Sequence, residues 1–315
     1  MSPASNRLRK TSSRNFVIAI TASLELNNWK LRRRLLPITF RFGLLLFGLL
    51  IFLPQRAAAE RVPEPSRWLS LWAGMLPIII AAPHGGRMAI PGIEVRRGIG
   101  VAQFSTERDS NTAELAELLA VNLRERLGAA PFLVIARFER KFIDANRAEN
   151  GAFESAAAKP YYDAYHRSLR EASAEVRQRW GSGLLLDIHG QGADADTIFR
   201  GTNKGKSVTA LRRRFGAAAL IGPKSILAQM AARGYRIAPV DDQERNYTGG
   251  YTTQTYGSHS GTQIDAIQLE FGGNLRKQSN LAKTAADLAA AIEIFAGEYL
   301  PPAAPSPGHP PPQEP

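Results

Sequence analysis

The sequence predicts an α/β protein in which a mostly parallel or mixed central sheet is flanked by helices. Short apolar runs beside glycine, at 77–82, 183–188 and 266–269, are typical of buried strands. Longer segments with apolar residues at helical spacing, such as 161–180, separate these runs. Strands that alternate with helices favour a mostly parallel sheet in an α/β sandwich.

The chain is long enough for one full-sized domain. It has 315 residues, of which 44% are hydrophobic, and a single domain of roughly 230–250 residues fits this length. Residues 1–59 carry ten Lys/Arg and one acid, a net +9 of the total charge of +12, which leaves +3 for the remainder. The body of the chain therefore gives little electrostatic reason to expect a nucleic-acid partner.

Residues 1–59 are predicted to be a signal peptide or an N-terminal anchor. Basic residues are followed by an apolar run at 42–53 and by Ala57-Ala58-Ala59. Twelve apolar residues suit a signal peptide and fall short of the roughly 20 that span a bilayer. We therefore expect an exported protein, periplasmic or secreted, that begins at Glu60 after cleavage. The alternative is a membrane-anchored protein that contacts the membrane only through this uncleaved segment.

Two further features concern export. Arg32-Arg33-Arg34-Leu35-Leu36 loosely matches a twin-arginine signal, and the long basic region allows a start later than Met1. The absence of cysteine excludes disulfides and thiolate metal ligands without deciding the compartment.

The first half of the body alternates strands and helices. Prolines 63 and 65 predict a linker at 60–75, before a catalytic domain at 76–300. Apolar spacing predicts a helix over 110–127 with Asp109 or Ser110 as its N-cap. An apolar run predicts a strand at 131–136, and the helix at 161–180 begins after Pro160 and ends before Gly181.

The second half continues this pattern. We expect a further strand at 217–221 and a helix over 224–232 that ends before Gly234. Glycine, threonine, serine and tyrosine at 247–261 are typical of a long loop over a site. An alanine-rich helix at 281–299 ends the domain, and eight prolines in 301–315 predict a disordered tail.

Three predicted strands run into His84, His189 and Glu270, each beside glycine. Because ligands bind outside the carboxyl ends of strands in open α/β sheets, these side chains are expected to meet. A catalytic zinc needs three nitrogen or carboxylate ligands and an open position, and a nearby carboxylate acts as general base. The sequence thus predicts one Zn²⁺ held by His84 and His189, with Glu270 as the base.

The third ligand is an acid that follows His84. Asp109 is preferred to Glu107, although a simple helix N-cap equally explains an aspartate at 109. Asp187 lies two residues before His189 on the same face of its strand, where it would orient the ligand or approach the metal. His166 is expected either in the core or at the substrate, and His259 on the surface.

A set of short motifs resembles the N-formylglutamate amidohydrolase family in the expected order, over about 76–300. The motifs are Pro83-His84-Gly85-Gly86, Asp109 with Thr112, Asp144-Ala145-Asn146-Arg147, Tyr162 to His166, Leu186-Asp187-Ile188-His189-Gly190, Gly249-Gly250-Tyr251-Thr252 and Asp265-Ala266-Ile267-Gln268-Leu269-Glu270.

The resemblance implies a zinc carboxypeptidase-like (phosphorylase/hydrolase-like) three-layer sandwich and a metal-dependent amide hydrolase. It implies that His84, Asp109 and His189 hold the zinc and that Glu270 activates its water. Asn146, Arg147 and Tyr251 would bind a substrate carboxylate, which a planar guanidinium receives through two hydrogen bonds. The alternative for Arg147 is a structural ion pair with Asp144. Arg147 or Arg200 would stabilise the oxyanion.

The apparent export signal departs from family members of histidine breakdown, which belong in the cytoplasm. The expected substrate is therefore a small N-acyl amino acid or a peptide with a free carboxylate, rather than N-formylglutamate itself. Two other classes remain open: an exported binding protein for acidic small molecules on the same fold, and a serine hydrolase built on Gly257-Ser258-His259-Ser260-Gly261.

Overall fold

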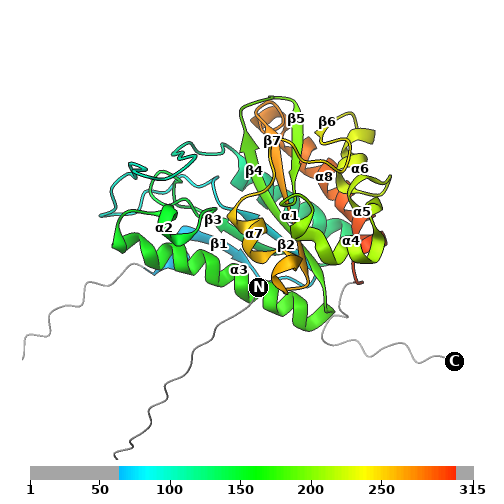
Figure 1. The fold of residues 1–315 in the computed structure, drawn as a ribbon, viewed down its shortest axis with the longest axis horizontal. Helices are drawn as coiled ribbons and strands as arrows, with labels where there is room; N and C mark the ends of the chain where they lie inside the picture. Colours follow the sequence, from blue (N-terminus) through cyan, green and yellow to red (C-terminus); the bar gives the residue numbers. More distant parts are fainter. Residues whose placement is uncertain (1–63, 303–315) are drawn as a thin grey trace, which may run out of the picture. The chain divides into compact units, whose positions relative to one another are not determined.

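The computed structural model describes residues 64–302, which form a seven-stranded mixed sheet with helices on both faces (Figure 1). The predicted signal or anchor at 1–59 and the tail from 303 onward lie outside the described residues. The strands are β1 (Leu69–Trp72), β2 (Ile78–Ala82), β3 (Phe132–Ala136), β4 (Gly183–Gln191), β5 (Thr197–Gly201), β6 (Arg236–Ala238) and β7 (Ile264–Gly272). The α-helices are α1 (Thr112–Leu127), α2 (Glu149–Ala152), α3 (Lys159–Trp180), α4 (Thr209–Phe215), α5 (Ala218–Ile221), α6 (Ile226–Ala232), α7 (Tyr251–Tyr256) and α8 (Gln278–Tyr299).

The strand order is β1-β3-β2-β4-β7-β5-β6. Parallel pairing joins β3, β2, β4 and β7 at the centre, whereas β1 and β5 pair antiparallel with their neighbours β3 and β7. The predicted α/β class with a mostly parallel or mixed sheet is confirmed. Because β2, β4 and β7 are parallel neighbours, their carboxyl ends lie at one edge of the sheet.

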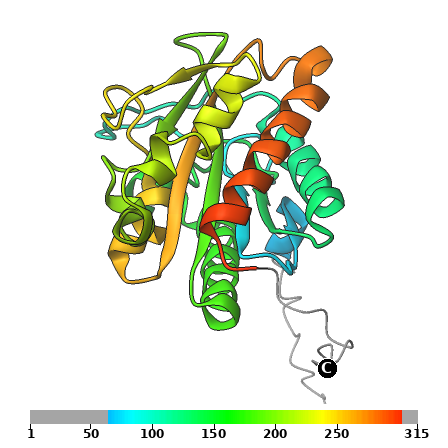
Figure 2. The same ribbon diagram turned by 90° about the vertical axis from the view of Figure 1, so that its right-hand side faces the viewer.

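Alternation along the strands builds two cores, one on each face. In β2, Ile78 and Ile80 pack in the core formed with α1, α6 and α8, whereas Ile79 and Ala81 pack in the core formed with α3. Figure 2 looks onto the first face, where α8 (orange to red) and α1 (teal) lie side by side. The result is the predicted three-layer arrangement of helix, sheet and helix.

Several local predictions differ from the structure. Residues 218–221 form helix α5 instead of the strand predicted at 217–221, because alanine favours helix and the run is too short to show a period. The predicted loop at 247–261 contains helix α7, which begins after Gly250 and buries Thr252, Thr253 and Tyr256 on one side. Within the predicted linker, β1 forms by pairing with β3, a long-range contact that four residues cannot signal.

The other predicted elements are present with ends shifted by a few residues. Gly181 ends α3 in the left-handed conformation, as its place after Trp180 predicts. No helix within 64–302 is long and apolar enough to cross a membrane.

Candidate metal centre and active-site cleft

His84 and Asp109 are brought together by two loops at the carboxyl edge of the sheet. His84 follows β2 by two residues, and its backbone carbonyl accepts a hydrogen bond of 3.1 Å from Asp109 N. The loop passes so close to α1 that a Cβ on Gly85 would lie 2.4 Å from Ala113 N. Glycine at this position therefore allows the close approach that places His84 beside Asp109.

His189 and Glu270 face each other across β4 and β7. The two residues are paired in the parallel register of these strands, and both are buried. Asp187 lies on the same face of β4 as His189, and its Oδ2 is 3.0 Å from His189 Nε2.

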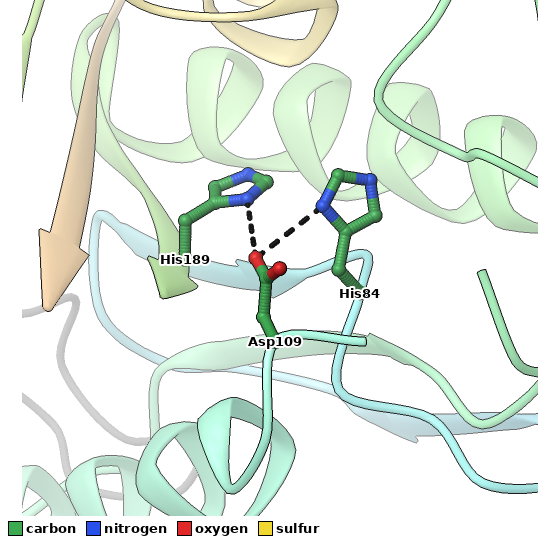
Figure 3. A group of neighbouring side chains, drawn as sticks. All are labelled: His84, Asp109 and His189. Atoms are coloured by element: carbon green, nitrogen blue, oxygen red, sulfur yellow. Dashed lines mark hydrogen bonds and ion pairs between the residues drawn. The ribbon is translucent and has the colours of Figure 1, made fainter. Parts of the chain in front are cut away.

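The side chains of His84, Asp109 and His189 converge on one point (Figure 3). Asp109 Oδ2 lies 3.1 Å from His189 Nδ1 and 3.4 Å from His84 Nδ1. The imidazole ring centroids are 4.8 Å apart, and all three residues are buried. Among residues 64–302, these three form the group that could hold a metal ion, with ligand atoms all within 4.8 Å of one another.

The side-chain atoms that converge from His84, Asp109 and His189 suit a bound cation. Asp144 Oδ1 lies 2.7 Å from His84 Nε2, and Asp187 accepts from His189 Nε2, so each Nε2 carries the proton. The Nδ1 lone pairs of both histidines then face an anionic carboxylate oxygen. His84 Nδ1 is buried without a hydrogen-bond partner within 64–302. Three converging acceptors repel one another unless a positive ion lies between them, which is the condition that a bound metal meets.

The pKa shifts of Asp109 and His189 also favour a positive charge at this centre. Burial raises the pKa of Asp109, but the adjacent His84 and His189 outweigh it and hold this pKa well below its usual range. Burial lowers the pKa of His189, yet the carboxylates of Asp187 and Asp109 raise it well above its usual value. The centre thus favours a positive charge next to an ionised Asp109.

Glu270, the predicted base, lies next to His189 of this centre. Burial raises the pKa of its carboxyl, against the lowering effect of nearby His189. Gln268 Nε2 donates to Glu270 Oε1 at 2.7 Å and fixes the carboxylate, while Gln268 Oε1 accepts from Gly250 N. A fixed carboxylate with a raised pKa suits proton transfer near neutral pH.

Asp144 joins the metal centre to the Asn146-Arg147 motif. Its carboxylate is fully buried and accepts from Asn146 N at 3.1 Å, from Arg147 Nε at 3.0 Å and from Arg140 Nε at 3.1 Å. The ion pair of Asp144 with Arg147, weighed as an alternative to substrate binding, is present. Arg147 also donates to the carbonyls of Ala102 and Gln103, so three of its five N–H groups are used.

An open cleft of about 500 Å³ adjoins the centre. His84, Arg140, Asn146, Arg147 and Tyr251 line it, so the predicted substrate-binding residues share one surface. Asn146 Oδ1 accepts a hydrogen bond from Thr252 N at 2.7 Å, and Asn146 Nδ2 lies 3.1 Å from His189 Nε2. This motif and the metal centre therefore form one continuous site, which we call the metal cleft.

Two alternative predictions, Asp109 as a helix N-cap and Glu107 as the acidic ligand, are wrong. Asp109 does not cap α1, because the N-cap is Asn111 without a side-chain cap, and the carboxylate of Asp109 accepts from Gly190 N instead. Glu107 is exposed and lies outside the group of three.

The prediction that Arg200 could stabilise the oxyanion is wrong. It is buried beside Glu244 and donates to the carbonyls of Leu220 and Asp241. Arg140, which no sequence motif indicated, lines the metal cleft together with Arg147, and its Nη1 lies 3.6 Å from Asp109 Oδ1.

The loop considered for a serine nucleophile is structural. Ser258 Oγ donates to Asp265 Oδ1 at 2.8 Å and accepts from Ala210 N at 2.9 Å, and His259 beside it is exposed. His166 is buried and its Nδ1 lies 2.9 Å from the Tyr256 hydroxyl. The described residues therefore give Ser258 no histidine base.

Comparison with known proteins bears on this site. Residues 152–275 match the family model of N-formylglutamate amidohydrolase. The matched segment includes His189 and Glu270, but it begins after His84, Asp109 and Asn146. No curated protein matches the chain. The family match over this part of the chain agrees with the resemblance predicted from the sequence.

Solved structures are similar to the chain at low identity, and the first of them shares its fold. N-formylglutamate amidohydrolase from Ralstonia eutropha is similar with a TM-score of 0.50 and 16% identity, over 73% of this chain and 98% of that chain. A gene product from Agrobacterium tumefaciens gives 0.46 and 16%, over 73% and 94%. A metallo-carboxypeptidase from Pseudomonas aeruginosa gives 0.40 and 14%, over 70% and 57%.

Proposed function

We propose that this protein is an exported zinc-dependent hydrolase that cleaves an amide bond in a small N-acyl amino acid or in a peptide with a free carboxylate. The convergence of two histidine Nδ1 atoms and one carboxylate oxygen, beside a buried glutamate and an open cleft, carries this proposal. Two imidazoles and one carboxylate are a frequent ligand set of catalytic zinc, which leaves a position open for substrate.

His84, Asp109 and His189 would hold one zinc ion. When bound, the ion would supply Lewis-acid chemistry: it would polarise the scissile carbonyl and lower the pKa of a water towards about 7. Asp144 and Asp187 keep the two imidazoles in the tautomer that presents Nδ1.

Glu270 moves the proton. Since Gln268 occupies Oε1, Oε2 is the oxygen that takes a proton from the attacking water. The water oxygen forms the new bond to the carbonyl carbon, the carbon–nitrogen bond breaks, and Glu270 returns the proton to the leaving amine.

Asn146, Arg147 and Tyr251 would bind the substrate carboxylate. The three protein acceptors around Arg147 hold its guanidinium in one orientation, and two N–H groups remain for a ligand. Arg140 lies next to His84 in the metal cleft, so its charge favours an oxyanion there.

Export rests on the leader at 1–59, whether it is cleaved or kept as an anchor. The low net charge of the remainder supports a small-molecule or peptide substrate, and no nucleic-acid partner is proposed.

A hydrolysis screen tests the proposal. Zinc-loaded protein without the leader is assayed on N-formyl, N-acetyl and peptide amides that bear a free carboxylate, with the Glu270→Gln variant as control. We expect hydrolysis of at least one class and a loss of several orders of magnitude in the variant, which keeps its zinc. A protein that binds these compounds without turnover would be a binding protein instead.

A further inference from the structure

Arg276 is a buried arginine in the turn between β7 and α8. Its guanidinium donates hydrogen bonds to three backbone carbonyls: Nε to Phe271 O at 2.9 Å, Nη2 to Gln191 O at 3.4 Å and Nη1 to Ser110 O. The three carbonyls belong to segments that are far apart in the sequence. One side chain therefore links the end of β7, the end of β4 and the loop before α1.

Each of these carbonyls lies one or two positions after a residue of the site, which are Glu270, His189 and Asp109 in the same order. A guanidinium is planar and its N–H groups point in fixed directions, so the acceptors that it binds are held in fixed positions relative to one another. Arg276 thus joins the segments that carry the proposed base and two of the three proposed metal ligands.

Gly190 allows the guanidinium to lie against β4. A Cβ at Gly190 would lie 2.4 Å from Arg276 Cζ, so a side chain at this position would displace the guanidinium. The backbone N–H of Gly190 donates to Asp109 Oδ2 at 3.1 Å. The same residue of β4 therefore lies against Arg276 and binds the carboxylate of the metal centre.

A second hydrogen bond ties the loop before α1 to Arg276. Asn111 Nδ2 donates to the backbone carbonyl of Arg276 at 2.7 Å, next to the bond from Arg276 to Ser110. Asn111 has a left-handed backbone with φ of 63°, a conformation that asparagine adopts more readily than most residues. Asp109 thus belongs to a loop that two reciprocal hydrogen bonds join to the turn after β7.

The charge of Arg276 lies near two carboxylates of the site, although its hydrogen bonds go to carbonyls. Burial lowers the pKa of Arg276, against the raising effect of Asp109 and Glu270. A positive charge near the metal centre opposes a bound cation, because like charges repel. The charge and the hydrogen bonds of Arg276 therefore have opposite expected effects on metal binding, which makes the two roles separable.

We propose that Arg276 is a positioning residue, which holds Asp109 at the metal centre and Glu270 beside it through the three carbonyls. The effect on zinc affinity and turnover rests on the proposed function. The effect on the position of Asp109 does not, because it is present in the metal-free protein as well.

Three variants perturb Arg276 in different ways. Arg276→Met removes both the hydrogen bonds and the charge, Arg276→Lys keeps the charge, and Gly190→Ala keeps the arginine but displaces its guanidinium. Arg200→Met is the matched control, because Arg200 is a buried arginine that donates to two backbone carbonyls and does not line the metal cleft.

Three measurements are made on variants that urea unfolding shows to be folded. Amide hydrogen exchange of residue 190 in the metal-free protein reports on its hydrogen bond to Asp109, with Leu186 in the middle of β4 as the reference. Chelator competition gives the zinc affinity. The kinetic constants kcat and KM are measured on the substrate that the hydrolysis screen identifies.

We expect Arg276→Met and Gly190→Ala to accelerate exchange of residue 190 about tenfold relative to Leu186. Both should lower zinc affinity about 10- to 100-fold, as for loss of a residue that supports metal ligands. Arg276→Lys should show part of both effects, and Arg200→Met neither. Turnover should fall mainly in kcat, because Glu270 acts in the chemical step.

Unchanged exchange of residue 190 in both Arg276→Met and Gly190→Ala overturns the inference. Tighter zinc binding by Arg276→Met also overturns it, because the charge would then be the dominant effect. If Arg276→Met does not fold, Gly190→Ala and Arg276→Lys decide. Failure of the wild type to bind zinc or to hydrolyse any substrate overturns the proposed function, while the exchange data still decide whether Arg276 positions Asp109.

Discussion

Replacement of Asp144 by asparagine should weaken the metal centre and the fold together. The fully buried Asp144 carboxylate accepts hydrogen bonds from His84, Asn146, Arg140 and Arg147. Removal of one partner from a buried charge pair costs roughly 3–5 kcal/mol, and loss of a carboxylate that orients a metal-bound histidine weakens metal affinity about 10- to 100-fold. That affinity loss corresponds to about 1.4–2.8 kcal/mol.

Asp187→Asn is the matched comparison. Asp187 is equally buried, but it contacts His189 through Oδ2, and its Oδ1 has no hydrogen-bond partner within the described part of the chain. This variant should lose a similar share of zinc affinity with less effect on stability, because no arginine is left unpaired.

The assays are chelator competition for zinc affinity and urea unfolding of the metal-free proteins. The reasoning is refuted if Asp144→Asn binds zinc as tightly as the wild type, or if it is no less stable than Asp187→Asn.

Three further predictions concern other parts of the site. The folded-state pKa of His166, about 4, lies below the unfolded value of 6.5, so the unfolded chain binds the proton first on acidification. The stabilisation that comes from this pKa shift is fully present above pH 6.5 and is lost as the pH falls to about 4. Over this range, urea unfolding of the metal-free protein should show a loss of roughly 3 kcal/mol in the free energy of unfolding, and His166→Phe should lack this loss. The same dependence of unfolding free energy on pH in both proteins would contradict the prediction. Ser258→Ala should keep full hydrolysis of amides at a modest cost in stability, and loss of turnover in the folded variant would restore the serine mechanism. Gly250→Ala should lower kcat/KM about tenfold, because its Cβ would lie 2.2 Å from Asn146 Nδ2, and the hydrogen bond from Thr252 N holds the Asn146 side chain in place; unchanged kinetics would show that Asn146 can move.

Strand ends carried most of the information on the site in the sequence. His84, His189 and Glu270 each follow an apolar run beside glycine, and parallel β2, β4 and β7 bring those ends to one edge. The sequence favours Asp109 over Glu107, but the structure is needed to tell a side chain of the metal centre from a helix N-cap at this position, because the two look the same in sequence.

Partners from distant segments were harder to predict. The contact between His84 and Asp144 joins residues 60 positions apart, and that between Asp109 and Gly190 joins residues 81 apart. The short strands β1, β5 and β6 also depend on long-range pairing, and their three to five residues show no clear period.

Metal content tests the central claim most directly. Protein expressed without the leader is loaded with zinc, dialysed and analysed for bound metal as wild type, His84→Ala and His189→Ala, with the exposed His259→Ala as control. We predict one zinc ion per chain in the wild type and the control, and loss of zinc in the two folded variants of the centre. Stoichiometric zinc in both His84→Ala and His189→Ala would contradict the assignment.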